Sequence, residues 1–118
     1  MERFSRKQLF MMGAAAVVMA VVLGICFYYM PANRIARQLE LGYRYLENEQ
    51  YEEAVVAFEK VIEIDAKQVP AYLGEASAYA AMEDYTGAAA VLERGYGQTA
   101  DAELENRLAE VCREAAQY

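Results

Sequence analysis

A long apolar run near the start of the chain predicts a membrane-spanning helix over residues 9–30. From Leu9 to Met30 the sequence reads LFMMGAAAVVMAVVLGICFYYM, which holds no charged residue. Arg6 and Lys7 precede this run, and Arg34 follows it. At a rise of about 1.5 Å per residue, a helix of this length crosses the hydrocarbon core of a bilayer. The run is therefore expected to hold the chain in a lipid bilayer as a single-pass anchor.

Two alternatives for this run involve cleavage of the chain. A secretory signal has an apolar core of about 7–15 residues followed by small residues at its cleavage site, whereas the segment 27–31 is bulky. The residues before Cys26 resemble a lipoprotein signal, but Ile25 stands where that signal needs a small residue, and apolar residues continue past Cys26. An uncleaved anchor is the favoured interpretation, and a cleaved or lipidated form is the alternative.

Small residues form a stripe along one face of the predicted membrane helix. Ala16, Ala20 and Gly24 follow one another at intervals of four. Such a stripe lets two membrane helices approach closely, although alanine and glycine are common in membrane spans in any case. A weak homodimer through these residues is a secondary expectation.

The basic residues that flank the run give only a weak preference for the side of the membrane on which the rest of the chain lies. Lysine and arginine near the two ends of the run are equal in number: Arg3, Arg6 and Lys7 before it, and Arg34, Arg37 and Arg44 after it. The first group is concentrated in a short basic N-terminal tail, residues 1–8, which is typical of an N-terminus that stays in the cytoplasm. We therefore expect the soluble part to lie outside.

Beyond a short connector at residues 31–33, apolar positions recur at helical spacing, and the pattern repeats with a period of about 34 residues. Polar turns divide each repeat into two apolar-periodic stretches, so each repeat is expected to form a helical hairpin. Helices are predicted over residues 34–48, 51–64, 70–82 and 85–96. The segment 95–97, Gly-Tyr-Gly, is expected to end the fourth helix. The predicted fold class is all-α.

The repeat resembles the tetratricopeptide repeat (TPR), a family of antiparallel helix pairs of about 34 residues each. In the first unit, residues 34–68, the resemblance is carried by Leu41, Gly42, Tyr45, Ala54 and Phe58. In the second unit, residues 69–102, it is carried by Tyr72, Ala76, Tyr79, Ala88 and Leu92. The second unit departs from the pattern at Glu75, where the family usually has leucine, and neither unit has the proline that often follows the second helix.

The matching positions are expected to pack the helices together. The resemblance implies that small residues let the helices of a hairpin touch and that larger residues fill the space beside them. The small set is Gly42, Ala54, Ala76 and Ala88, and the larger set is Tyr45, Phe58, Tyr79 and Leu92. We interpret these eight residues as core.

The resemblance also implies a concave protein-binding groove lined by the first helix of each hairpin. Its expected residues are Leu39, Tyr43, Leu46 and Glu47 from the first unit, Leu73, Ser77 and Ala80 from the second, and Arg107 from the helix that follows. Leucine and tyrosine in a shallow groove can bury the apolar side chains of a peptide or helix. One subset of the family grips chaperone C-termini with lysine, arginine and asparagine at these inner positions. This chain has leucine, tyrosine and serine there instead, so that partner is disfavoured. An alternative is that the capping helix or the membrane already covers this surface.

A fifth helix is expected over residues 103–118 as a cap on the second repeat, started by Thr99 or Asp101. Its apolar residues form one face: Leu104, Leu108, Val111, Cys112 and Ala115. Cys112 is interpreted as a small core residue. An alternative is that this helix begins a third repeat that another chain completes.

Charge and composition exclude several functions. The net charge of −7 combines a basic N-terminal tail, +2 over the first eight residues, with a remainder of −9. An acidic domain is repelled by phosphate backbones, so nucleic-acid binding is not expected. The chain has no histidine, and neither cysteine has a second ligand at metal spacing. Carboxylate pairs such as Glu52 and Glu53 are interpreted as solvated charge. We expect no catalysis, no metal and no cofactor.

These patterns together predict a membrane-anchored protein-interaction module, an adaptor or assembly factor whose groove binds a membrane-associated protein. The alternative is a structural subunit of a larger membrane or envelope complex that uses no groove.

Overall fold

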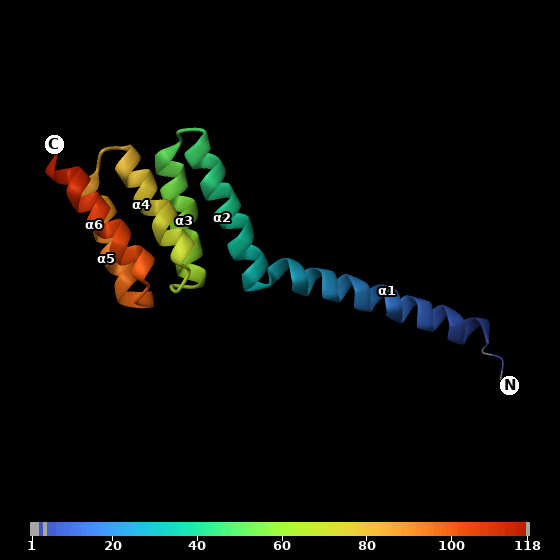
Figure 1. The fold of residues 1–118 in the computed structure, drawn as a ribbon. Helices are drawn as coiled ribbons and strands as arrows, with labels where there is room; N and C mark the ends of the chain where they lie inside the picture. The colour runs from blue at the N-terminus through green and yellow to red at the C-terminus, as the bar shows by residue number, and fades with distance from the viewer. Residues whose placement is uncertain (1–2, 4, 118) are drawn as a thin grey trace. The chain divides into compact units, whose positions relative to one another are not determined.

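The structure is a computed structural model that describes residue 3 and residues 5–117, and these residues form six helices and no strand. In chain order the helices are α1 (Arg6–Tyr29), α2 (Pro31–Glu47), α3 (Tyr51–Ile64), α4 (Val69–Ala81), α5 (Tyr85–Thr99) and α6 (Ala102–Ala116) (Figure 1). The chain divides into two units, Met1–Asn33 and Arg34–Tyr118. The second unit holds the repeats and is called the repeat domain below.

The apolar run forms α1, which begins at Arg6 and so slightly earlier than the predicted span. Ser5 caps the helix, since its hydroxyl accepts from the Gln8 amide while the Gln8 side-chain oxygen accepts from the Ser5 amide. Within the described residues, α1 is the one helix long and apolar enough to cross a membrane, with a mean hydropathy of 2.6. A signal sequence would satisfy the same criteria. Part of the expected basic tail, residues 1, 2 and 4, lies outside the described residues.

The expected connector at residues 31–33 is helical instead. Met30 is extended, with ψ at 135°, because a proline ring disfavours the helical conformation of the residue before it. Pro31 then opens α2, where its fixed φ suits the first helical position and its missing N–H is not needed. Only Met30 therefore separates α1 from α2.

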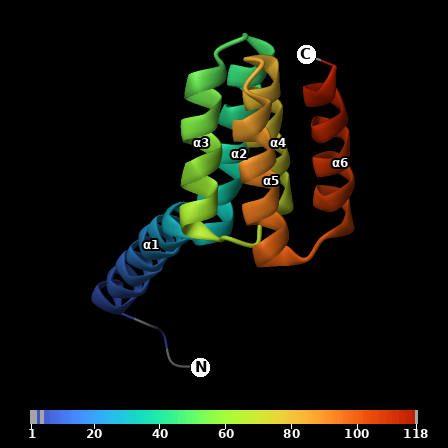
Figure 2. The ribbon, with the colours of Figure 1, turned by 90° about the vertical axis from the view of Figure 1, so that its left-hand side faces the viewer.

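Consecutive helices of the repeat domain run antiparallel (Figure 2). The two hairpin turns have the same backbone geometry, since Glu49 and Glu83 both have φ at 60°. After each of them an amide closes the turn onto a tyrosine carbonyl, Gln50 onto Tyr45 at 2.8 Å and Asp84 onto Tyr79 at 2.9 Å. The repeat is thus present in the backbone as well as in the side chains.

Two neighbouring groups of buried side chains form the core of the repeat domain. One is centred on Phe58 and packs α3 against α2 and α4, and the other is centred on Tyr72 and packs α4 against α5 and α6. Both rings lie against glycine backbone. An added methyl at Gly42 would stand 2.7 Å from the Phe58 ring, and one at Gly95 would stand 2.6 Å from Tyr72. The core therefore depends on helices that approach closely at glycine.

The predicted end of the fourth helix at residues 95–97 is wrong. The helix α5 continues to Thr99 and ends at Ala100, which adopts the left-handed conformation with φ at 53°. Gly95 is buried in the middle of the helix, where it makes room for Tyr72. Its role is close packing, and the helix does not stop there.

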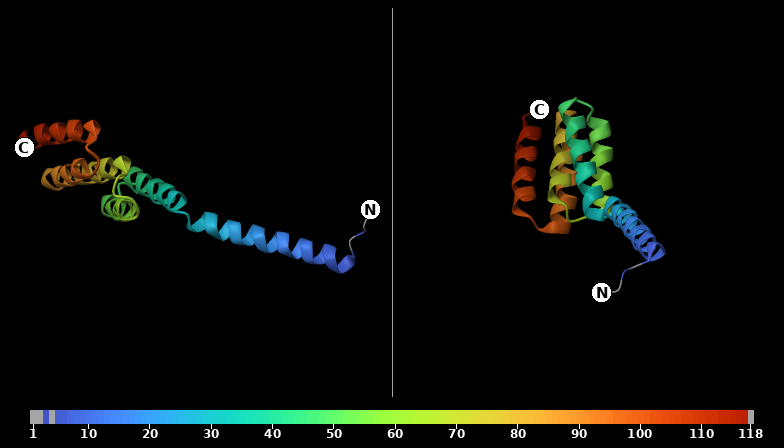
Figure 3. Two further views of the ribbon diagram at one scale, coloured as in Figure 1. Left: turned by 90° about the horizontal axis from the view of Figure 1, so that it is seen from below. Right: turned by 90° about the vertical axis from the view of Figure 1, so that its right-hand side faces the viewer.

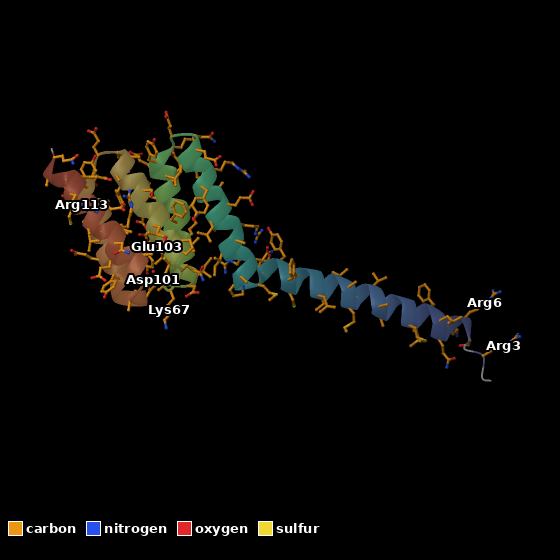
Figure 4. The ribbon with its side chains drawn as sticks, in the orientation of Figure 1. Arg3, Arg6, Lys67, Asp101, Glu103 and Arg113 are labelled. Atoms are coloured by element: carbon orange, nitrogen blue, oxygen red, sulfur yellow. The ribbon has the colours of Figure 1, made fainter. Side chains whose placement is uncertain are left out.

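The helix α6 packs on α5 and α4 at the end of the repeat domain, and α3 lies at the opposite edge in the views of Figures 2 and 3. Asp101 caps it by accepting from the Glu103 amide at 2.9 Å (Figure 4). Leu104 and Val111 are buried against the second group. The expectation that Cys112 is a core residue is wrong, because its side chain is exposed.

Cys112 and Ala115 instead line an open cavity of about 340 Å³ between α5 and α6. Fewer residues of α6 therefore pack against the core than its apolar pattern predicts. The last residue expected in this helix, Tyr118, lies outside the described residues.

Candidate protein-binding surface

The exposed face of α2 carries a shallow hollow of about 470 Å³, lined by Leu39, Glu40, Tyr43, Arg44 and Glu47. We call it the α2 hollow. Leu39, Tyr43 and Glu47 follow one another at intervals of four, so helical geometry places them on one face. The structure thus brings together three of the residues expected to line a groove.

Tyr43 is the large aromatic residue of the α2 hollow. Its side chain is 43% exposed, and its ring packs edge-on against Phe58 with the centroids 5.4 Å apart. Burial of its inner part raises the pKa of the Tyr43 hydroxyl, which keeps that hydroxyl protonated and able to donate. A ring fixed from below and open above is suited to bury an apolar group of a partner.

Charged side chains surround Tyr43. Arg44 and Glu40 pair along the helix at 3.0 Å, and both are well exposed. An exposed pair of this kind contributes little stability, so it remains available for exchange with a partner's charges. The arrangement has an aromatic centre with a polar rim, which is common in protein interfaces.

Two leucines expected in the groove contribute mainly to the core. Leu39 and Leu46 are half-buried and pack against the group centred on Phe58. Substituting them would disturb folding as well as any binding.

The α4 residues expected in the groove lie on one face of their helix and are half-buried. Leu73 and Ala80 pack against the core, and the Ser77 hydroxyl donates to the Leu73 carbonyl at 2.9 Å. This face is mainly apolar toward a partner, because the Ser77 hydroxyl already donates its proton within the helix.

Arg107 pairs within its own helix. Its guanidinium lies 2.9 Å from Glu110 and 3.5 Å from Glu114. Its charge is thus largely neutralised on α6, which weakens the case for a role in the groove.

The interpretation of the carboxylate pairs as solvated charge overlooked one buried group. Glu75 is 1% exposed, and its Oε2 atom has no hydrogen-bond partner. The nearest cation is Arg94, whose Nη2 atom lies 3.5 Å from that oxygen and 2.5 Å from Oε1 of Glu59. In the sequence, this buried carboxyl was indicated only by the presence of Glu75 where the repeat usually has leucine.

The pKa values of Glu75 and Glu59 are shifted in opposite directions. Burial, followed by the neighbouring Glu59 carboxyl, raises the pKa of Glu75 from 4.5 to about 8. Burial alone would also raise the pKa of Glu59, but its bonds with Glu75 and Arg94 outweigh burial and lower it. Bonding to Glu59 raises the pKa of Arg94 in turn. At neutral pH the cluster therefore holds a protonated Glu75 beside an ionised pair of Glu59 and Arg94.

Within the described part of the chain, no three histidine, cysteine, aspartate or glutamate residues are grouped so that they could hold a metal ion.

Comparison with known proteins matches the family model of the tetratricopeptide repeat to residues 45–111. No curated protein and no solved structure matches the chain. The matched segment covers more than half of the sequence and runs from the end of α2 into α6. The paired antiparallel helices and the glycine-mediated contacts agree with such a repeat. The chain therefore belongs to the tetratricopeptide repeat family, a protein-interaction repeat.

Proposed function

We propose that this protein is a membrane-anchored adaptor or assembly factor that binds a partner protein through the α2 hollow and the neighbouring face of α4. The observation that carries the proposal is Tyr43, a half-exposed ring supported by Phe58 and rimmed by charge. Such an aromatic anchor is typical of the residues that dominate binding energy at interfaces.

The anchor narrows the class of partner. The apolar helix α1 is proposed to cross the bilayer as an uncleaved span. A single non-helical residue joins it to α2, so the chain gives the repeat domain little freedom to leave the membrane. Membrane proteins and segments that emerge from them are the proposed partners.

Site-specific crosslinking tests the proposal. The full chain would carry photoreactive benzoylphenylalanine at residue 43 in native membranes, with the same group at Val56 as the control. Val56 is an exposed apolar residue of α3 outside the hollow. We expect an adduct of defined mass from residue 43 and none from residue 56.

Co-purification then measures the contribution of the ring. Tyr43→Ala should reduce recovery of the crosslinked partner at least tenfold, while Val56→Ala should leave it unchanged. Equal adducts at both positions, or recovery unaffected by Tyr43→Ala, would refute the proposal. Adducts from residue 56 alone would favour the second candidate, a structural subunit held by another surface.

A further inference from the structure

A second cavity, of about 340 Å³, opens on the other face of α4. The helices α3, α4 and α5 all contribute to it, and Glu75 lies in its lining. Counted around the helix at 100° per residue, Glu75 and Tyr79 lie roughly opposite Leu73, Ser77 and Ala80. The cavity is therefore separate from the surface proposed to bind a partner through Tyr43.

Charge in this cavity is unbalanced. Three carboxyl groups line it, from Glu59, Glu75 and Asp84, against the single guanidinium of Arg94. Arg94 interacts mainly with other groups, since it pairs with Glu59 and its Cζ atom lies 5.8 Å from the centroid of the Tyr72 ring. It comes no closer than 3.5 Å to Glu75. Arg94 thus leaves the Oε2 atom of Glu75 without a hydrogen bond.

A buried carboxyl oxygen without a partner is costly, and native proteins rarely tolerate one that serves no purpose. Leucine, which the repeat pattern has at this position, would carry no such cost. The oxygen belongs to a side chain that is almost fully buried and lines an open cavity. It therefore offers an acceptor to a group that enters from solvent.

The remaining walls suit a cation on an aliphatic stem. Tyr79, Ala90 and Val91 line the cavity beside the carboxyls, and apolar walls of this kind can take the methylenes of a long basic side chain. The volume is at the low end of the range for ligand pockets, about 300–1,000 Å³. It fits a single side chain better than a larger molecule.

We propose that this cavity binds the basic side chain, lysine or arginine, of a partner protein, with Glu75 as the acceptor at its base and Glu59 and Asp84 supplying the remaining negative charge. The neighbouring charged and titratable groups are Glu59 from α3, Tyr72 and Tyr79 from α4, Arg94 from α5, and Asp84, which caps α5. A cation that enters favours the ionised form of Glu75, so binding releases a proton to solvent. Binding should consequently tighten as the pH rises toward the pKa of Glu75.

Nuclear magnetic resonance titration of the full chain in neutral detergent micelles tests the site directly. The probes are Nα-acetyl-lysine amide and Nα-acetyl-arginine amide, with Nα-acetyl-norleucine amide as the uncharged control. We expect the amide signals of Gly87 and Val91 to shift with at least one cationic probe and not with norleucine. The stronger of the two cations then identifies the side chain that the cavity prefers.

The pH dependence assigns the acceptor. Between pH 6 and pH 8 the affinity for the preferred cation should rise severalfold, since Glu75 gives up its proton more easily at the higher pH. Glu75→Gln should lose this dependence and bind at least threefold more weakly at pH 8. Glu103→Gln removes an exposed carboxylate on α6 (Figure 4) and should change neither the affinity for the cation nor its pH dependence.

A second variant keeps the test independent of any packing change at Glu75. Asp84→Asn retains an oxygen to cap α5 through the Gly87 amide but removes a charge, so it should weaken binding while leaving the pH dependence intact. Equal shifts with norleucine, no shift with either cation, or unchanged binding by Glu75→Gln would overturn the proposal. None of these outcomes affects crosslinking from residue 43.

Discussion

The ring of Tyr72 in α4 lies directly over the backbone of Gly95 in α5, so that a methyl group at residue 95 would stand 2.6 Å from the Cγ atom of the ring. The ring cannot easily withdraw, because its hydroxyl donates to the Ala66 carbonyl at 2.7 Å. The contact sets the distance between the two helices.

Gly95→Ala is therefore expected to destabilise the repeat domain. Overpacking costs about 1–3 kcal/mol, which outweighs the gain of about 1 kcal/mol from replacing glycine with alanine in a helix. Gly97→Ala is the matched control in the same helix, since nothing lies within 4 Å of an added methyl there. Chemical unfolding followed by circular dichroism should show opposite shifts for the two variants, and equal shifts would contradict the contact.

Leu104 should make α6 essential to the fold. Its side chain is fully buried against the core, and truncating such a leucine costs about 2–5 kcal/mol. In Leu104→Ala we expect the free energy of unfolding to fall by that amount and hydrogen exchange to rise across α6. Glu105→Ala, an exposed neighbour, should leave both nearly unchanged. A cap that is dispensable would give the same exchange in both variants.

The stability of the repeat domain should fall as the pH rises from about 5 to about 8. The folded chain holds a proton on Glu75 up to about pH 8, whereas the unfolded chain releases it near 4.5. Folding therefore becomes less favourable by about 1 kcal/mol per pH unit within this window. The lowered pKa values of Glu59 and Asp65 act in the opposite direction, but below the window.

Glu75→Gln should remove most of this slope, because the amide does not titrate. Urea unfolding at pH 5, 6.5 and 8 would measure how the free energy of unfolding changes with pH in the wild-type protein and in Glu75→Gln. Parallel profiles would mean that Glu75 is not protonated in the folded chain.

Cys112 gives a direct test of membrane topology. Its thiol is exposed on α6, whereas Cys26 lies within the proposed membrane span. With the repeat domain outside, a membrane-impermeant maleimide should label intact cells through Cys112, and Cys112→Ser should abolish that labelling. Labelling that requires lysis of the cells would place the domain in the cytoplasm.

The helices and the repeat could be predicted from the sequence, because both depend on local periodicity. The apolar run, the spacing of the repeat and the cap at Asp101 need no knowledge of distant contacts. The exposed face of Tyr43 followed from the same spacing.

The errors arose where one residue type serves two purposes. Glycine is found at helix ends and also where helices pack closely. Gly95 serves the second purpose, because the Tyr72 ring lies against it. Proline interrupts a helix, but at Pro31 it also begins the next one. Cys112 lies at the margin of an apolar stripe, where the angle at which α6 packs determines burial.

The acidic cluster could not be predicted, since Glu59, Glu75 and Arg94 come from three different helices. Glu75 was visible in the sequence as a departure from the repeat pattern. Its partners became apparent only from the contact of α3 and α5 with α4.

The two hairpin turns point to a route for engineering the protein. Glu49 and Glu83 both hold a left-handed backbone, which costs an ordinary residue about 1–2 kcal/mol and glycine much less. Both side chains are exposed and line neither the α2 hollow nor the cavity at Glu75. Glycine at these positions would give a more heat-resistant version of the repeat domain that leaves both proposed binding surfaces unaltered, a suitable starting material for crystallisation with a captured partner.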